Sequence, residues 1–422
     1  MKTVYYIKLF NMETRIILVM IVKNETKNIR ECIASAVPWI DAICISDTGS
    51  SDDTVSIIQE FAVQKPTKVV TDFVFKNFGF NRTASIRAAE KFALEQNWSL
   101  SECRAMLLDA DCRILFKKSK SDVLSELDTF SGAMVNHTSL GTSYCRLNFL
   151  RMSENWNCIG STHEFWTSPN YGSTQNLTDV VSIQELNTGG CRSDKDERDI
   201  RLLENELLEV HHGVIQDLYT MGRRLFYLGR SHLNSQIGCK VRALQYLEQC
   251  TQVTKFPEEA FEARLLLFHS LTNNSAKDLL SQGLKHAFEG LKEMSCRPEL
   301  FYHVARLLAW KLESRIAACE LLLIAIRNSI PTPIEALKPF WIDCAMDVSG
   351  CSKEDYLSRT SKLFLQVQIV TFGLFEELAI CSTWTDTKKM YQTQGQRCNM
   401  FLLDHAEPAM KERARLRNKN YF

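Results

Sequence analysis

Seven consecutive apolar residues, Ile16-Ile17-Leu18-Val19-Met20-Ile21-Val22, stand near the start of the chain and are followed directly by Lys23-Asn24-Glu25. A run of this length suits a buried β-strand and is much shorter than the about 18 apolar residues that a membrane span needs. The polar residues after it do not resemble the small residues of a signal-peptide cleavage site. We therefore expect a strand that ends in polar residues, with no membrane span and no secretory signal.

Strands and helices alternate from this run to about residue 186. Apolar runs rich in Ile and Val predict strands, and stretches with apolar residues three or four apart predict helices between them. Such alternation indicates an α/β fold with a mainly parallel, Rossmann-like sheet. The predicted strands are 16–22, 42–46, 68–74 and 105–108, and the predicted helices are 29–37, 53–61 and 83–96.

From about residue 199 the pattern is helical throughout, with short polar turns. Leu228-Gly229 and Ala243 place small residues where paired helices must approach each other closely. This favours a tetratricopeptide-like array of helical hairpins, with a repeat longer and less regular than the usual ~34 residues, and an irregular helical bundle fits nearly as well. We expect an α/β domain over 13–210, the helical array over 211–410 and a basic tail over 411–422.

The composition excludes several classes of protein. Lys and Arg total 50, as do Asp and Glu, so the net charge is zero and a protein that coats nucleic acid is disfavoured. Apolar residues make up 45% and charged residues 24%, as in folded domains. The 15 cysteines include no C-x-x-C pair, which favours free thiols in a reducing compartment over disulfides or zinc ribbons. We expect a cytoplasmic location.

The end of the chain is locally basic, with Glu412 as the one acidic residue among five basic ones. Such a run usually forms a solvated helix end, and contact with an anionic partner is the alternative. The basic residues are Lys411, Arg413, Arg415, Arg417 and Lys419.

A polar turn follows the second predicted strand, at the edge of the sheet where ligands bind in open α/β folds. Asp47 ends this strand, and its carboxylate can accept a hydrogen bond from a base N–H or a ribose hydroxyl. A plain strand–turn–helix, in which Ser51 or Asp52 caps the helix, explains Gly49 as well but leaves Asp47 without a role.

Asp109-Ala110-Asp111 comes directly after the fourth predicted strand. Two carboxylates separated by one residue can hold a divalent cation that bridges to a diphosphate. Such a cation neutralises the charge that builds on a leaving nucleotide diphosphate, as glycosyl transfer requires. A bare D-x-D is often a solvated turn. Here it follows a predicted strand and lies downstream of the polar segments 23–25 and 47–52, and this position favours a metal site.

The chain resembles family 2 glycosyltransferases of the GT-A fold in four segments that occur in family order: 21–25 (I-V-K-N-E), 47–54 (D-T-G-S-S-D-D-T), 81–90 (N-R-T-A-S-I-R-A-A-E) and 107–111 (L-L-D-A-D). The resemblance covers about the first 200 residues. The helical second half is similar to a sub-group in which a tetratricopeptide-like array follows the catalytic domain, as in some peptide S-glycosyltransferases and glycosyltransferases of large DNA viruses.

The resemblance implies a site for a nucleotide-diphosphate sugar, with a UDP-sugar as the first expectation, together with Mn²⁺ or Mg²⁺. Arg82 and Arg87 would face the nucleotide or its phosphates, which suits the planar donors of a guanidinium, and Arg87 fits equally well as a surface residue. Asp111 would be the main metal ligand. On the nucleoside side, Val22, Asn24 and Glu25 would line the pocket, Asp47 would bind the base, and Asp109 would meet the ribose or sugar beside the metal.

On the acceptor side, the resemblance points to His163-Glu164, which follows a turn of small residues. Direct displacement at the anomeric carbon needs a carboxylate that takes the acceptor proton, and we assign this role to Glu164, with Asp109 as the alternative. His163 would bind the metal or orient the acceptor. A buried His–Glu pair between Trp156 and Trp166 is the structural alternative.

The chain departs from the family after the last predicted strand. Many relatives have a metal-binding histidine there, whereas this chain has L-N-T-G-G at 186–190. Metal binding would then be weaker, or be completed by phosphates and water, or by His163. The polar segment 189–198 is either a linker or a lid over the diphosphate, to which Lys195, Arg192 or Arg198 would reach.

These expectations combine into a metal-dependent inverting glycosyltransferase that acts on a hydroxyl or thiol of a protein, peptide or glycan. The helical array would present the acceptor or form a homodimer. Two alternatives stay open: an interaction scaffold whose GT-A domain has lost activity, and a sugar nucleotidyltransferase. Nucleotidyltransferases usually have a glycine-rich activating loop near the N-terminus, and none stands before Lys23.

Overall fold

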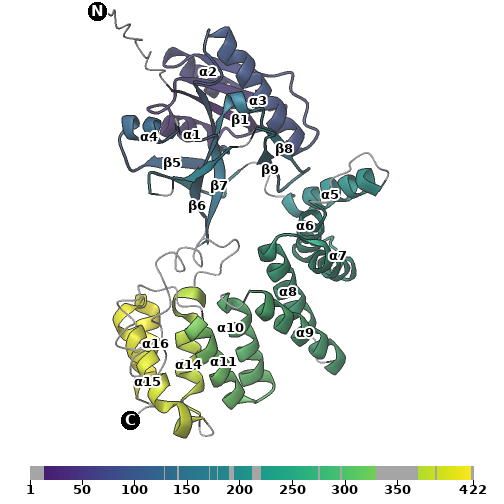
Figure 1. Cartoon of the computed structure of the whole chain (residues 1–422), viewed down its shortest axis with the longest axis vertical. Coiled ribbons are helices and arrows are strands. Elements are labelled where there is room, and N and C mark those ends of the chain that lie inside the picture. Colours follow the sequence, from purple (N-terminus) through teal and green to yellow (C-terminus); the bar gives the residue numbers. More distant parts are fainter. Residues whose placement is uncertain are drawn as a thin grey trace, which may run out of the picture. The chain divides into compact units, whose positions relative to one another are not determined.

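The computed structural model describes residues 14–127, 129–139, 142–170, 172–177, 179–189, 194–211, 220–273, 276–294, 297–328, 369–384 and 387–419. The chain divides into two compact units, Met1–Ile215 and Gln216–Phe422 (Figure 1). The first unit is α/β and the second is helical, so the predicted fold class is confirmed. Arg192 and the rest of 190–193 lie outside the described residues.

The N-terminal unit is built on a nine-stranded sheet within its described part, and most of its strand pairs are parallel. β1 lies inside the sheet, with β2 and β4 parallel to it on either side. Beyond β4, β7 runs antiparallel to both β4 and β6. In sheet order the strands are β3 (Thr67–Val70), β2 (Ala42–Asp47), β1 (Arg15–Val22), β4 (Cys103–Leu107), β7 (Thr142–Arg151), β6 (Gly132–Ser139), β11 (Val181–Glu185) and β5 (Cys112–Phe116), with β10 (Thr174–Asn176) also on β6.

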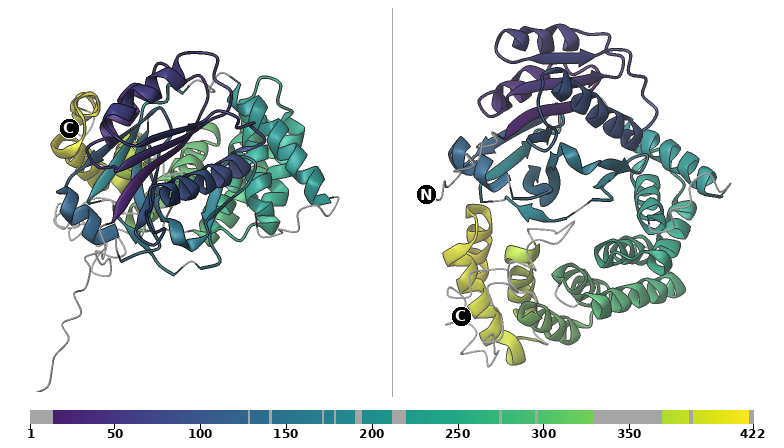
Figure 2. Two further views of the ribbon diagram at one scale, coloured as in Figure 1. Left: turned by 90° about the horizontal axis from the view of Figure 1, so that it is seen from above. Right: turned by 45° about the horizontal axis from the view of Figure 1, so that its top comes forward.

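Side chains alternate along β1, and both of its faces are covered. Ile16 and Leu18 pack in one core with α1 (Ile29–Ala36), while Ile17 packs on the opposite face against α3 (Phe78–Glu95). A strand buried on both faces has no solvent side, which explains why its sequence is apolar without interruption. Figure 2 shows the sheet of this unit between its helices.

Two predicted boundaries were wrong by several residues. Helix α3 begins at Phe78 and not at residue 83, because the Asn77 side chain caps it by accepting a hydrogen bond from the Phe80 N–H at 2.8 Å. Gly79 in the first turn interrupts the apolar spacing on which the predicted start was based. Strand β3 ends at Val70, short of the predicted residue 74.

The antiparallel half of the sheet positions the Asp109–Asp111 turn, which joins β4 to β5. Strand β7 pairs with β4, so side chains of β7 lie beside the residues that lead into the turn. Strand β11 pairs with β5 and places Glu185 opposite Cys112, directly after the turn. A small separate sheet of β8 (Asn157–Ile159) and β9 (Phe165–Thr167) frames the segment that contains Glu164.

The C-terminal unit consists of helices that pack mainly against their neighbours in the chain. Among the described residues, no helix is both long and apolar enough to cross a membrane. The helices are α6 (Met221–Asn234), α7 (Lys240–Val253), α8 (Pro257–Thr272), α9 (Lys277–Glu293), α10 (Pro298–Arg306), η3 (Leu307–Lys311), α11 (Arg315–Asn328), η4 (Ile369–Gly373), α14 (Leu374–Cys381), α15 (Lys388–His405) and α16 (Pro408–Asn418).

The first hairpin of this unit shows the close helix approach that its small residues predicted. A Cβ at Gly229 on α6 would lie 2.7 Å from Cγ of Leu247 and 3.1 Å from the carbonyl oxygen of Ala243 on α7. Any side chain at 229 would therefore force the two helices apart. A tetratricopeptide-like repeat stays a prediction, because such pairing is shared by other helical arrays.

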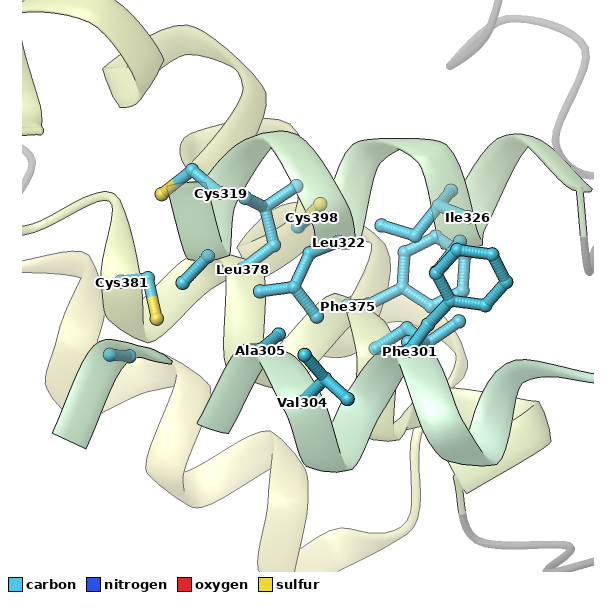
Figure 3. Packing of buried hydrophobic residues seen from close by; sticks show 14 of the residues in the cluster. Phe301, Val304, Ala305, Cys319, Leu322, Ile326, Phe375, Leu378, Cys381 and Cys398 are labelled. Atoms are coloured by element: carbon cyan, nitrogen blue, oxygen red, sulfur yellow. The ribbon is translucent and has the colours of Figure 1, made fainter. Parts of the chain in front are cut away.

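The later helices share one apolar core. Phe301 and Val304 of α10 meet Leu322 of α11 and Phe375 and Leu378 of α14 (Figure 3). All five side chains are at most 5% exposed, so these helices form a single packed layer and not independent hairpins.

Most of the predicted basic tail is part of helix α16. Met410 and Ala414 of this helix are buried, and Arg413 and Arg417 pair with Glu376 of α14. These two arginines thus form ion pairs within the helical unit.

Candidate active site

The Asp109–Asp111 turn is held in place by hydrogen bonds from three directions. The Cys112 N–H donates to the carbonyl oxygen of Asp109 at 3.0 Å, which closes the turn. The Leu186 N–H donates to the carbonyl oxygen of Asp111 at 2.9 Å, and the Cys32 thiol of α1 contacts the Asp109 carbonyl at 3.4 Å. The two carboxylates are therefore carried by a fixed backbone.

Arg82 joins the first of these carboxylates to the predicted base. Its Nε donates to Glu164 Oε1 at 2.6 Å, and its Nη2 donates to Asp109 Oδ1 at 2.7 Å. Arg82 lies on α3, so one helix brings together residues that are far apart in the sequence. The structure thus unites three of the predicted site residues.

Arg146 is a fourth member of this cluster, and it was not predicted from the sequence. Its Nη1 donates to Asp109 Oδ2 at 3.0 Å, and its Nη2 lies 3.6 Å from Glu164 Oε1. Arg146 comes from β7, where Tyr144, Arg146 and Asn148 alternate with apolar residues. This polar face of β7, a strand next to β4, is the sequence signal that could have pointed to Arg146.

The four charges shift one another's pKa values. Burial alone would raise the pKa of Asp109, but the guanidinium groups of Arg82 and Arg146 outweigh it and hold that pKa well below its usual range. The same balance lowers the pKa of Glu164. Burial opposes the charged form of Arg82 and Arg146, yet the carboxylates raise the pKa of both. All four side chains are thus ionised near neutral pH.

Asp111 and Glu25 border a common space at the end of this turn. The Gly189 N–H donates to Asp111 Oδ2 at 3.1 Å. A Cβ at position 189 would lie 3.3 Å from that oxygen and 3.6 Å from Glu25 Oε1. Two carboxylate oxygens near one point are ligands of the kind that Mg²⁺ and Mn²⁺ prefer, and phosphate oxygens and water would have to complete the coordination.

Asn28 and Thr188 occupy the place where the sequence departs from the family. The Thr188 hydroxyl donates to Asn28 Oδ1 at 2.8 Å, and Asn28 Nδ2 donates to the Thr188 carbonyl at 3.0 Å and to Glu25 Oε2 at 2.9 Å. These hydrogen bonds link α1 to the segment after β11 and fix the backbone where the resemblance leads us to expect a histidine. Neither residue was singled out in the sequence.

The turns after β1 and β2 support each other at the predicted nucleoside edge. The Thr48 N–H donates to the Val22 carbonyl at 2.9 Å, and the Ser51 N–H donates to Asn24 Oδ1 at 2.8 Å. Asp47 Oδ2 accepts from the Ser50 N–H at 2.9 Å, so its carboxylate orders its own turn. This gives Asp47 a structural role, and its contact with a base stays a prediction.

Arg87 and Lys195 have partners outside the Arg82 cluster. Arg87 Nη2 donates to Asn155 Oδ1 and to the Trp156 carbonyl, each at 2.7 Å, and thereby holds the segment before β8. Lys195 opens helix α5 (Lys195–His211), with its Nζ 3.7 Å from Asp199 Oδ2. These contacts fit the surface-helix alternative for Arg87 and place Lys195 at the start of α5, and contact of either residue with a donor stays a prediction.

The loop before Glu164 is packed against the start of α3. The Gly79 N–H donates to the Gly160 carbonyl at 3.0 Å, and a Cβ at Gly79 would lie 2.4 Å from that oxygen. Glycine is therefore required at 79 for the helix to approach the loop.

Helix α5 holds the same loop from the other side. Glu206 Oε2 accepts from the Ser161 N–H at 2.9 Å, and Asp199 Oδ1 accepts from the Thr162 hydroxyl at 3.1 Å. Asp199 and Glu206 are buried acids seven positions apart on one helix, a spacing that could have pointed to them in the sequence. Glu164 is thus carried by a segment fixed from both sides.

His163 faces this helix. Its Nε2 lies 3.3 Å from Asp199 Oδ2, and burial lowers the pKa of its imidazole while Asp199 opposes that effect. Among the described residues, Asp109, Asp111 and His163 do not form a set of ligand atoms within 4.8 Å of one another. The structure therefore does not assemble this predicted trio on its own.

Residues 17–129 match the family model for Glycosyl transferase family 2. This stretch begins within β1 and contains β2 to β5 and the Asp109–Asp111 turn. No curated protein matches the chain significantly.

Two solved structures show distant likeness to the chain. The crystal structure of S. aureus TarS is similar over 67% of this chain and 55% of its own chain, with 11% identity and a TM-score of 0.35. The structure of S. aureus TarS 1–349 in complex with UDP is similar over 97% of this chain and 89% of its own, with 12% identity and a TM-score of 0.24. The chain thus spans about half the length of the first of these structures. The family model carries the likeness: residues 17–129 of the N-terminal unit are similar to the glycosyltransferases of family 2.

Proposed function

We propose that the chain is a metal-dependent, inverting glycosyltransferase that moves a sugar from a nucleotide-diphosphate donor to a protein, peptide or glycan. The observation that carries this proposal is the bridge of Arg82 between Asp109 and Glu164. It puts a guanidinium, which suits a diphosphate, between the D-x-D turn and the carboxylate that would act as base.

Glu164 is the base in this proposal. One of its carboxylate oxygens takes the proton of the acceptor hydroxyl or thiol as the acceptor oxygen or sulfur attacks the anomeric carbon. The bond from that carbon to the phosphate oxygen breaks, and its electron pair leaves with the nucleoside diphosphate. A single displacement of this kind inverts the configuration of the sugar.

The arginines give the base a dependence on the donor. Arg82 and Arg146 lower the pKa of Glu164 and so make it a weak base while they are paired with it. A diphosphate competes for the same guanidinium groups, and its negative charge raises the pKa of nearby carboxylates. Glu164 therefore becomes the stronger base once the donor is bound, when there is a sugar to transfer.

Asp111 and Glu25 would hold the metal ion, with Asp109 beside it. Mn²⁺ or Mg²⁺, when bound, neutralises charge on the leaving diphosphate. Asp111 is 7% exposed, and the Gly189 N–H fixes its carboxylate. His163 is left out of this ligand set because its Nε2 is directed to Asp199.

The donor and the acceptor are each proposed only as a chemical class. The edge formed by Val22, Asn24 and Asp47 would take the nucleoside, and UDP-sugars are the first donors to test. The helical unit Gln216–Phe422 would present the acceptor or form a homodimer.

The proposal is tested by a screen of donor hydrolysis with UDP-, GDP- and dTDP-sugars, each with Mn²⁺ and with chelator. We expect turnover with sugars of one base, and its loss with chelator or in Asp111→Asn. Arg30→Gln, which breaks an exposed pair with Glu60, should keep it. Thermal shift reports binding separately, since a ligand at about 100 times its Kd stabilises by about 2.7 kcal/mol. Binding of a donor without any turnover would favour the alternative of an inactive interaction scaffold. Full turnover in the presence of chelator would contradict the proposed metal dependence.

A further inference from the structure

A second polar cluster lies next to the Asp109–Asp111 turn. It consists of Cys112, His137 and Glu185, whose ligand atoms all lie within 4.8 Å of one another. Within the described part of the chain, it is the single group of three or more His, Cys, Asp or Glu side chains that meets this distance. The residues come from β5, β6 and β11, which are adjacent in the sheet order, so the cluster is built on rigid strands.

A hydrogen-bond chain sets which nitrogen of His137 carries a proton. Asn148 Nδ2 donates to the Leu107 carbonyl at 2.9 Å, which leaves Asn148 Oδ1 to face His137 Nε2 at 2.9 Å. That amide oxygen can only accept, so Nε2 is the protonated nitrogen. His137 Nδ1 is then the atom that faces Glu185 Oε1, at 2.8 Å.

This arrangement requires positive charge between His137 and Glu185. Nδ1 of a neutral imidazole with a proton on Nε2 carries a lone pair, and so does each oxygen of a carboxylate. The Tyr144 hydroxyl donates to the same Glu185 oxygen, which confirms that this oxygen acts as an acceptor. His137 is 1% exposed, so water does not screen the contact. Either a proton on Nδ1 or a metal ion between the ligand atoms would relieve the repulsion.

We propose that Cys112, His137 and Glu185 supply three ligands of a Zn²⁺ site. Thiolate sulfur, imidazole nitrogen and carboxylate oxygen are the ligand types that zinc takes in proteins, and the thiolate selects against Mg²⁺ and Mn²⁺. A thiolate and a carboxylate together balance the two charges of the ion, as a buried site needs. The Nε2–H bond to Asn148 is the outer contact that orients a metal-bound histidine.

The proposed site would stabilise the segment that carries Asp111. Cys112 follows Asp111 directly, and Leu186, whose N–H donates to the Asp111 carbonyl, follows Glu185. An ion held by Cys112 and Glu185 would therefore clamp both strands behind the turn. The proposal stands on this geometry alone and goes beyond the transferase function.

Co²⁺ binding tests the site on the full chain, because cobalt bound to a thiolate gives a near-ultraviolet charge-transfer band. After removal of metal by chelator, we expect about one equivalent of Co²⁺ to produce this band without nucleotide, and Zn²⁺ to displace it. Cys112→Ser should abolish the band, and Cys44→Ser, which alters another buried strand thiol, should keep it.

Two further variants separate this site from the donor site. Asp111→Asn should keep the band although donor turnover is lost, and His137→Gln should lose the band even if Cys112→Ser fails to fold. A wild-type chain that gives no thiolate band and retains no Zn²⁺ would overturn the proposal, leaving a buried imidazolium–carboxylate pair. Loss of the band in a folded Asp111→Asn would overturn it as well, because the ion would then belong to the donor site.

Discussion

The Nε–H of Arg82 donates a hydrogen bond to Oε1 of Glu164 over 2.6 Å, although 82 positions separate the two residues in the chain. The same guanidinium bonds to Asp109, so a change at Arg82 affects the D-x-D turn and the loop of Glu164 together. This relationship connects the donor side of the site to the acceptor side, and it makes specific variants informative.

Replacing Arg82 by Lys should lower kcat/KM by about 10²- to 10³-fold, because an ammonium keeps the charge but cannot reach both carboxylates with a planar fork. Steady-state donor hydrolysis measures this. Arg87→Lys is the matched control: it lies on the same helix but holds the segment at Asn155, so turnover should change little. Equal losses in both variants would indicate damage to α3 in place of a role in the site.

Replacing Arg146 by Gln should move the acid limb of the kcat/KM profile to higher pH. Burial raises the pKa of Glu164, and the charges of Arg82 and Arg146 overcome this and lower it. Loss of one charge lets the pKa rise, and the base must be ionised, so activity is lost earlier as the pH falls. The position of the limb is independent of the absolute rate. If the acid limb stayed at the same pH, Arg146 would have no effect on the pKa of the catalytic base.

Replacing Gly189 by Ala should raise the Mn²⁺ concentration for half-maximal turnover. The new Cβ would lie 3.3 Å from Asp111 Oδ2, tighter than an ordinary contact, so the carboxylate must shift. A shifted ligand weakens metal binding, by about tenfold or more where outer contacts are lost. Gly172→Ala is the control, since its Cβ would crowd only Ser131 Oγ. The same Mn²⁺ dependence in both variants would place the metal elsewhere.

Helical packing in the second unit should make its stability depend on pH through Glu262. This carboxylate pairs with Arg297 at 2.6 Å, but burial raises its pKa to about 7, with Arg297 opposing and Glu299 adding to the effect. The folded state thus binds the proton more tightly than the unfolded state. The stability it contributes is present below the ordinary carboxyl range and is lost as the pH rises through about 7.

Thermal unfolding between pH 5 and pH 8 checks this effect. Between these pH values, the free energy of unfolding should decrease by roughly 1–3 kcal/mol less in Glu262→Gln than in wild type. Glu412→Gln, which alters an exposed carboxylate of the same unit, should leave the slope unchanged. A Glu262→Gln slope as steep as that of wild type would refute the assignment.

Local patterns in the sequence were enough to predict the parallel half of the sheet. The apolar run of β1 and the polar residues at 23–25 and 47–52 follow from a strand buried on both faces that ends at a binding edge. The Asp109–Asp111 turn was predicted for the same reason. Features that depend only on residues close together in the chain were therefore predictable from the sequence.

Contacts across the antiparallel half could not be predicted in this way. Arg146 reaches Asp109 because β7 turns back beside β4, and no local motif determines that pairing. Asp199 and Glu206 hold the Glu164 loop from α5, and their spacing marks one face of that helix but not the loop that this face contacts. His137 and Glu185 meet because β6 and β11, which are distant in sequence, pair in parallel.

Turnover of the donor by Glu164→Gln tests the central claim most directly. Glutamine keeps the shape of the side chain but cannot take a proton, so kcat should fall by about 10²- to 10⁴-fold. The donor, measured by calorimetry, should bind at least as tightly as to wild type, because the two arginines lose a competing charge. Transfer by a folded Glu164→Gln at the wild-type rate would contradict the claim that Glu164 is the base paired with Arg82.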